Sequence, residues 1–201
     1  MPVLDKRALL AEVSAANPIA IELGCGPSKR DTAAVGIDVL DFPGVDLVGD
    51  IFEVLAALPD ASVRHCYSSH FLEHVADLPR LIAEFERIVA PGGEVEAKVP
   101  HFSNPYFYSD PTHSRFFGLY SLSYFAGDAI HARKVPTYGH ALKFDLVATR
   151  LEFDSPFPLR GLFKRLVGRV FDSGNWMREF WEENLCYLFP GYSVCYRLRR
   201  R

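Results

Sequence analysis

The sequence predicts an α/β fold: a doubly wound, mostly parallel sheet of seven strands with an aromatic-rich insert after the fifth strand. Two observations support this prediction. A glycine loop follows the first apolar run, and short runs rich in β-branched residues alternate with helical patterns. With 201 residues and 49% hydrophobic content, the chain can bury one substantial core, so we expect a single domain.

The glycine loop, Gly24-Cys-Gly-Pro-Ser-Lys29, directly follows the first expected strand, which begins at Ile19. Gly24 and Gly26 lack a Cβ, so the backbone can turn there and let a ligand lie against it. Asp38 ends the second expected strand, and a carboxylate at that place can accept hydrogen bonds from both hydroxyls of a ribose. The loop lacks the third glycine of the dinucleotide pattern. The pattern therefore favours an adenosine-containing ligand without a pyrophosphate, with purely structural glycines as the alternative.

The run Glu22-Leu-Gly-Cys-Gly26 resembles motif I of the class I S-adenosylmethionine-dependent methyltransferases, and a helix followed by Pro91-Gly-Gly93 and a strand is a second resemblance. The similarity is to the small type-11-like members found among glycan and secondary-metabolite genes. It implies a Rossmann-like fold, S-adenosylmethionine as cofactor and S-adenosylhomocysteine as product. The cofactor-binding residues that it implies are Glu22, Gly24, Cys25, Gly26, Asp38, Val39, Asp50, Ile51, Ser68 and Ser69. The resemblance implies that Asp50 binds the adenine amino group and that Ile51 packs on the base. For Asp50, an alternative is that it only caps the following helix.

The remaining elements follow in order. We expect a covering helix over 6–16, a third strand over 44–50 that ends in the acid Asp50, a fourth over 63–68, a helix over 69–89, a fifth strand over 94–99, a sixth over 144–153, helices over 159–171 and 175–188, and a last strand over 192–198. The cofactor core then spans about 18–100, the insert about 101–143 and a C-terminal cap 144–201. Ligands of such sheets bind at the carboxyl ends of the strands, so the residues there should converge on one edge.

The insert is irregular and aromatic, which suits substrate binding; a packed aromatic lid without substrate contact is the alternative. We expect Tyr106, Tyr108, Phe116 and Phe117 to form flat walls, and the substrate-binding residues to be Asn104, Tyr108, Asp110 and Arg115. A general base, where one is needed, is expected to be a histidine, in the order His70, His113 and His101. For each histidine, a structural role is the alternative.

His70-Phe-Leu-Glu-His74 also matches the H-x-x-E-H pattern of some zinc enzymes, with His101 or His113 as a possible third ligand. This short pattern has low information content, and a protease would leave the glycine loop and Asp38 unexplained. We therefore expect no metal, with incidental metal binding left open.

A net charge of −3 argues against a dedicated nucleic-acid binder. Four cysteines without paired spacing fit reduced thiols, and no leader or long apolar stretch is evident, so we expect a cytoplasmic protein. The helix over 159–171 is amphipathic and basic; we expect its apolar face to pack on the domain, with contact to a membrane surface as the lesser alternative.

The resemblance implies an enzyme that transfers a methyl group to an oxygen or nitrogen of a small molecule. The alternatives are a methyltransferase for a glycan, lipid-linked or protein acceptor, and a cofactor-binding protein without transfer activity. The sequence leaves the acceptor and the oligomeric state open.

Overall fold

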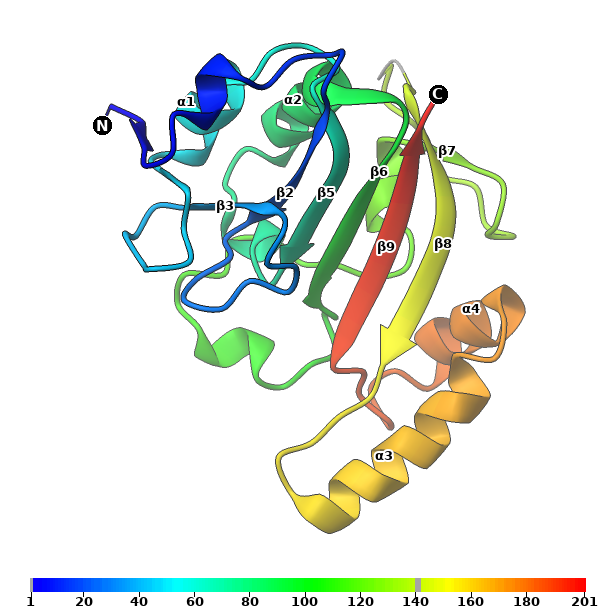
Figure 1. Cartoon of the computed structure of the whole chain (residues 1–201). Helices are drawn as coiled ribbons and strands as arrows, with labels where there is room; N and C mark the ends of the chain where they lie inside the picture. The colour runs from blue at the N-terminus through cyan, green and yellow to red at the C-terminus, as the bar shows by residue number, and fades with distance from the viewer. Residues whose placement is uncertain (1, 140–141) are drawn as a thin grey trace.

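The structure, a computed structural model, describes residues 2–139 and 142–201 (Figure 1). Its strands are β1 (Leu4–Asp5), β2 (Ile19–Leu23), β3 (Val35–Asp38), β4 (Leu47–Val48), β5 (Val63–Ser69), β6 (Val89–Pro100), β7 (Gly127–Asp128), β8 (Phe144–Glu152) and β9 (Ser193–Arg200). Its α-helices are α1 (Ile51–Ala57), α2 (Leu78–Ile88), α3 (Pro158–Phe171) and α4 (Asn175–Asn184). Short 3-10 turns occupy Leu9–Ala11, Leu72–His74, Phe107–Ser109 and Ser121–Tyr124.

All strands form one sheet in the order β1-β4-β3-β2-β5-β6-β9-β8-β7. Strands β4, β3, β2, β5 and β6 are parallel, and β9 runs antiparallel between β6 and β8. The predicted seven strands form the centre, and the two-residue strands β1 and β7 extend its edges. The strand order reverses between β2 and β5, the place where ligands of open α/β sheets bind.

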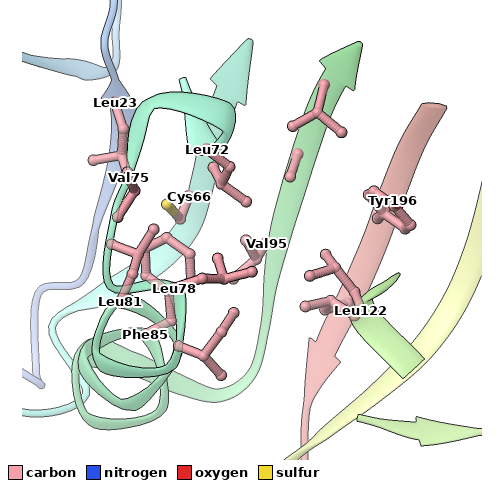
Figure 2. Packing of buried hydrophobic residues seen from close by; sticks show 14 of the residues in the cluster. Leu23, Cys66, Leu72, Val75, Leu78, Leu81, Phe85, Val95, Leu122 and Tyr196 are labelled. Atoms are coloured by element: carbon pink, nitrogen blue, oxygen red, sulfur yellow. The ribbon is translucent and has the colours of Figure 1, made fainter. Parts of the chain in front are cut away.

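One face of the sheet carries the core. α2 has a strongly apolar side, and Leu78, Leu81 and Phe85 from it are buried against Cys66 and Val95 of the sheet (Figure 2). The insert and α4 extend the same cluster, since Leu122 of the insert and Trp181 of α4 belong to it. This continuous cluster confirms that the chain can bury one substantial core.

The opposite face of β5, β6, β9 and β8 has no helix over it in the part of the chain that the structure describes, and Figure 1 views the sheet from this side. Exposed Arg150 and Arg197 stand on it, beside the ion pairs Arg30–Glu96 and Lys98–Glu152. The parallel order of a doubly wound sheet is therefore present, but a helical layer covers only one side. The short connection from Gly26 to Val35 leaves no room for the first crossover helix.

Two expected helices differ from the prediction. Over 6–16 there is only the 3-10 turn Leu9–Ala11, because Ala8 before it adopts a left-handed backbone with φ 54°. The helix expected from residue 69 begins at Leu78, because β5 runs on to Ser69 and His70 is left-handed with φ 54°. Asp77 then caps α2, whose second residue is Pro79. Strand β6 begins at Val89, five residues before the expected start, so Pro91-Gly-Gly93 lies inside the strand; the other boundaries agree within four residues.

Helix α3 projects from the body at the carboxyl end of β8 (Figure 1). Strand β8 is antiparallel to β9, as is β6, so β8 runs parallel to β6. α3 therefore begins at the same edge as the glycine loop. None of the helices in residues 2–139 and 142–201 has the length and apolar character needed to cross a bilayer.

Candidate functional site

The glycine loop after β2 turns through two left-handed residues, Gly24 with φ 59° and Gly26 with φ 56°. A Cβ on Gly24 would lie 2.7 Å from Cδ2 of Phe71, whereas a Cβ on Gly26 would meet nothing within 4 Å. Gly24 is thus required by backbone and packing together. Gly26 leaves an open side on which a ligand can lie against the backbone.

Glu22 holds the far end of the loop. Its buried carboxylate accepts hydrogen bonds from the backbone N–H of Arg30, at 2.9 and 3.0 Å, and of Asp31, at 3.3 Å. In this structure Glu22 therefore fixes the path of the loop. Cys25 packs beside Val45 and Val48, and burial, together with the nearby Asp38 carboxylate, raises the pKa of its thiol to about 11.

Asp38 lies at the end of β3, beside the loop. One carboxylate oxygen accepts from the Gly26 N–H at 2.9 Å, and the other accepts from the Leu40 N–H at 2.9 Å. Each oxygen therefore keeps a lone pair for a further donor. Loop and acid are joined by a hydrogen bond, as a shared ligand site requires.

Asp50 is the N-cap of α1: its side chain accepts from the N–H groups of Phe52, at 2.9 Å, and Glu53, at 3.4 Å. The capping alternative is therefore confirmed, and a contact with adenine remains a prediction. Ile51 is half-buried behind it, and Val39 is exposed. Ser68 is buried, and its hydroxyl has no hydrogen-bond partner in residues 2–139 and 142–201, while Ser69 is half-buried at the end of β5.

His101 is fully buried after β6. Its Nδ1 lies 2.8 Å from Ser103 Oγ, and its Nε2 lies 3.0 Å from a carboxylate oxygen of Glu182. Both ring nitrogens are engaged, so this geometry corrects the expected role: His101 ties β6 to α4 and is not available to an acceptor.

His70 and His113 are better placed. The His70 side chain is 38% exposed, and its Nδ1 lies 3.4 Å from Glu73 Oε1. His113 places its Nδ1 2.9 Å from the Phe107 carbonyl oxygen, and its ring packs edge-on against His74. Both lie near the carboxyl end of β5. His70 directly follows this strand, and His113 is held nearby because the N–H of the next residue, Ser114, donates to the Glu73 carbonyl oxygen at 2.8 Å.

Among the predicted substrate residues, Asn104 is buried and braces its own turn, bonding the Tyr192 carbonyl and the Tyr106 N–H. This geometry gives Asn104 a structural role. Arg115 is half-buried and donates to the Ala76 carbonyl. Asp110 accepts from Thr112, whose hydroxyl and amide bonds hold the pKa of this exposed carboxyl below its usual value.

The aromatic insert does form a hollow. A cavity of about 430 Å³ is lined by aromatic rings from the insert and by Glu182 of α4. Three of the four predicted walls line it, namely Tyr108, Phe116 and Phe117; Tyr106 does not. A second cavity of about 440 Å³ lies on the open sheet face, lined by Tyr67, Arg150 and Arg197 among others.

The sequence reasoning missed Phe71, which covers Gly24, and Glu182, which binds both His101 and the Leu119 N–H. Neither is foreseeable from spacing alone. Glu182 does belong to a run of acids, Glu179, Glu182 and Glu183, on one short helix, and such a run near the insert was the available signal.

Comparisons with known proteins point to one family. Residues 28–96, about a third of the chain, match a family described as "Methyltransferase domain"; this segment includes Asp38, Asp50 and Ser68 and begins just after the glycine loop. No curated protein matches the sequence.

Several solved structures share the fold. A S-adenosylmethionine-dependent methyltransferase from Archaeoglobus fulgidus is 17% identical with a TM-score of 0.55, covering 94% of this chain and 89% of its own. Phosphoethanolamine N-methyltransferase 2 of Haemonchus contortus, solved with S-adenosyl-L-methionine, is 14% identical with a TM-score of 0.53, covering 92% and 49%. A Haloferax volcanii putative methyltransferase in complex with the activator Trm112 is 15% identical with a TM-score of 0.51, covering 98% and 88%.

At these identities the structural likeness establishes the fold. Together with the match over residues 28–96, it confirms the predicted resemblance to S-adenosylmethionine-dependent methyltransferases: this segment matches the family "Methyltransferase domain", and the chain shares the fold of these enzymes.

Proposed function

We propose that the protein transfers a methyl group from S-adenosylmethionine to an oxygen or nitrogen of a small-molecule acceptor. The observation that carries the proposal is the Asp38 carboxylate, bonded to the Gly26 N–H with lone pairs to spare, beside an open glycine turn. These features fit the cofactor: Gly26 leaves room against the backbone, and Asp38 can accept from two ribose hydroxyls. When bound, the cofactor supplies a methyl group on a good leaving group.

The chain's own contribution is then mainly alignment, which can supply up to about 7–11 kcal/mol. The aromatic hollow beside Tyr108 and Phe116 offers flat walls for an acceptor. His70 is the base that we favour for an acceptor hydroxyl, since it is partly exposed at the end of β5. A positioned base contributes roughly 10²–10⁴-fold.

The first test is calorimetric titration with S-adenosylmethionine and S-adenosylhomocysteine. Asp38→Ala is expected to weaken binding by about 1.5–3 kcal/mol, because a charge-assisted bond is lost, and the variant should remain folded. Gly24→Val is the control that blocks the loop. Binding by the native protein with the same affinity in Asp38→Ala would remove Asp38 from the site, and no binding at all would refute the proposal.

A second candidate, a lipid-linked acceptor, is favoured by helix α3. The helix packs inward through Gly161 and Gly168: a Cβ on Gly168 would lie 2.9 Å from Cδ2 of Phe153. Lys164 also faces inward and donates to the Pro190 carbonyl at 3.0 Å, and burial lowers the pKa of its ammonium group. The inward face of α3 therefore combines Gly161, Gly168 and Lys164 with Phe171, whose ring packs against Phe153 and Phe189.

The apolar side of α3 points away from the body. Leu159 is 85% exposed, and each other member of this stripe is at least half exposed: Leu162, Phe163, Leu166 and Val170. These positions follow helical spacing and share one face. The expectation that this face packs on the domain is therefore wrong for these four residues, whereas Val167, also expected on the face, is half-buried. The glycines on the opposite side allow the closer approach to the body.

The positive charges of α3 indicate which kind of surface its apolar stripe would bind. Its exposed cations, Arg160, Arg165 and Arg169, flank the apolar stripe, and the helix contains no acid. This pattern complements an anionic lipid surface, with the apolar stripe in the headgroup boundary. Since α3 starts at the same sheet edge as the cofactor site, docking there would face that site toward lipid headgroups.

Co-sedimentation tests this candidate with phosphatidylcholine vesicles that contain or lack phosphatidylglycerol. Binding should require the anionic lipid and fall by about 2 kcal/mol in R165Q/R169Q, at about 1 kcal/mol for each charge. The matched control, R150Q/R197Q, removes the same charge from the open sheet face. Two results would overturn the lipid candidate. One is an equal loss of vesicle binding in both variants. The other is a protein that does not bind vesicles but forms a dimer, which L162Q/L166Q dissociates.

A further inference from the structure

We propose that Glu73, His74 and His113 form a binding site for a divalent transition-metal ion. One potential ligand atom from each residue lies within 4.8 Å of the other two. The site joins the 3-10 turn after β5 to the insert, and the H-x-x-E-H pattern enters it with Glu73 and His74, while His113 takes the place expected of His70.

Glu73 is the observation that points to a missing ligand. Its side chain is fully buried, and neither carboxylate oxygen has a hydrogen-bond partner among the described residues. His70 Nδ1 lies 3.4 Å from Oε1 without forming a hydrogen bond, and among the described residues no ion pair joins Glu73 to the half-buried Arg115. A buried carboxylate keeps its charge only when it is paired with a cation, hydrogen-bonded or bound to a metal.

The two histidines have the hydrogen bonds that a ligating imidazole commonly has. Thr112 Oγ1 lies 2.6 Å from Asp110 Oδ1 and must donate to that carboxylate, so His74 Nδ1, 2.9 Å from the same hydroxyl, is the donor there. His113 Nδ1 likewise donates to the Phe107 carbonyl oxygen at 2.9 Å. Both rings therefore keep a free lone pair on Nε2, and a ligating histidine commonly donates its other N–H to an oxygen in this way.

The donor set selects the class of ion. Two imidazoles and one carboxylate suit zinc or another first-row divalent ion better than magnesium or calcium, which prefer oxygen ligands. Ligand atoms around tetrahedral zinc lie about 3.3 Å apart, so the cluster needs a small contraction. His74 is exposed, so its side chain can move toward the ion. Asp110 Oδ2 lies 3.6 Å from His113 Nε2 and could provide a further ligand atom.

If the proposed transfer holds, the ion would serve it by binding an acceptor oxygen and lowering the pKa of that hydroxyl. His113 would then be a ligand and His70 the remaining candidate base. The metal site itself rests on the cluster and stands independently of methyl transfer.

The experiment is calorimetric titration of the metal-free full-length protein with Zn²⁺, and with Co²⁺ followed by visible absorption, both without cofactor. We expect one ion to bind per chain with micromolar or tighter affinity, and the visible absorption bands of bound Co²⁺ to indicate a low coordination number. Glu73→Gln and His113→Asn should each weaken binding at least tenfold. His65→Asn, on the open face of β5, removes a histidine outside the cluster and should leave binding unchanged.

Circular dichroism and thermal unfolding of each variant separate lost binding from lost folding, and His74→Asn, at an exposed position, provides a variant that should fold normally. No binding by the native protein, or equal weakening in His65→Asn, would overturn the site. S-adenosylmethionine titrated into the metal-free protein tests the cofactor separately, so failure of one proposal is distinguishable from failure of the other.

Discussion

Gly24 and Gly26 have the same left-handed backbone but different surroundings. Only Gly24 lies under a side chain, that of Phe71, while Gly26 faces open space and the Asp38 carboxylate. A sequence motif treats the two glycines alike. In the structure, one serves packing and the other serves access to the backbone.

This difference predicts unequal effects of alanine. Each substitution places a Cβ on a left-handed residue, which costs about 1–2 kcal/mol. Gly24→Ala should lose about 1–3 kcal/mol more, since its Cβ overpacks Phe71. Urea unfolding of both variants measures the gap. Equal stabilities would show that Phe71 moves aside without loss.

At the scale of elements, α1 is a seven-residue helix whose first turn depends on Asp50. The same carboxylate is implied in adenine binding by the family resemblance. In the capping role the Asp50 side chain binds backbone N–H groups of α1, whereas in the predicted cofactor role it would bind adenine. A substitution that keeps the cap but cannot reach adenine can therefore separate the two roles.

Asp50→Ala should lower the free energy of unfolding by about 0.5–2 kcal/mol, and Asp50→Ser should restore most of that loss by capping. The serine is too short to reach a base, so weaker S-adenosylmethionine binding by Asp50→Ser, measured by calorimetry, would report the cofactor contact. Unchanged affinity in a stable Asp50→Ser protein would leave Asp50 as a cap alone.

For the whole molecule, the insert is anchored to the sheet by a buried polar network. Asp128 accepts from Ser123 Oγ at 2.5 Å and from His131 Nδ1 at 2.8 Å, and His131 Nε2 lies 3.1 Å from Thr149 Oγ1 on β8. Burial alone would raise the pKa of Asp128, but the bonds from Ser123 and His131 outweigh burial and hold this pKa below its usual value.

A lowered carboxyl pKa gives stability that is present above the unfolded pKa, about 3.9, and is lost as the pH falls through the folded value. Acid should therefore loosen the insert below about pH 4. Asp128→Asn should lose about 1–3 kcal/mol at neutral pH, because buried partners are left unsatisfied, and its stability should depend less on pH in the acid range. Unfolding midpoints between pH 3 and 7 measure this, and parallel profiles would contradict it.

The local elements were largely predictable. Runs of β-branched residues placed the seven central strands, and Gly24, Gly26 and Asp38 indicated the cofactor edge because turn geometry and strand-end chemistry are local properties. Two kinds of prediction were wrong. Ala8 and His70 adopt left-handed backbones that end the expected helices. His101 is buried and bound by Glu182, which lies 81 residues away in the sequence, so its role depends on a contact that local spacing does not reveal.

The sequence by itself determined the α/β class, the order of most elements and the acid beside the glycine loop. Only the tertiary structure decided which histidines meet Glu73, which side of α3 stays exposed and which sheet face remains bare. The physical reason is that periodicity and turn chemistry act between near neighbours. Burial and pairing depend on which distant segments the folded chain brings into contact.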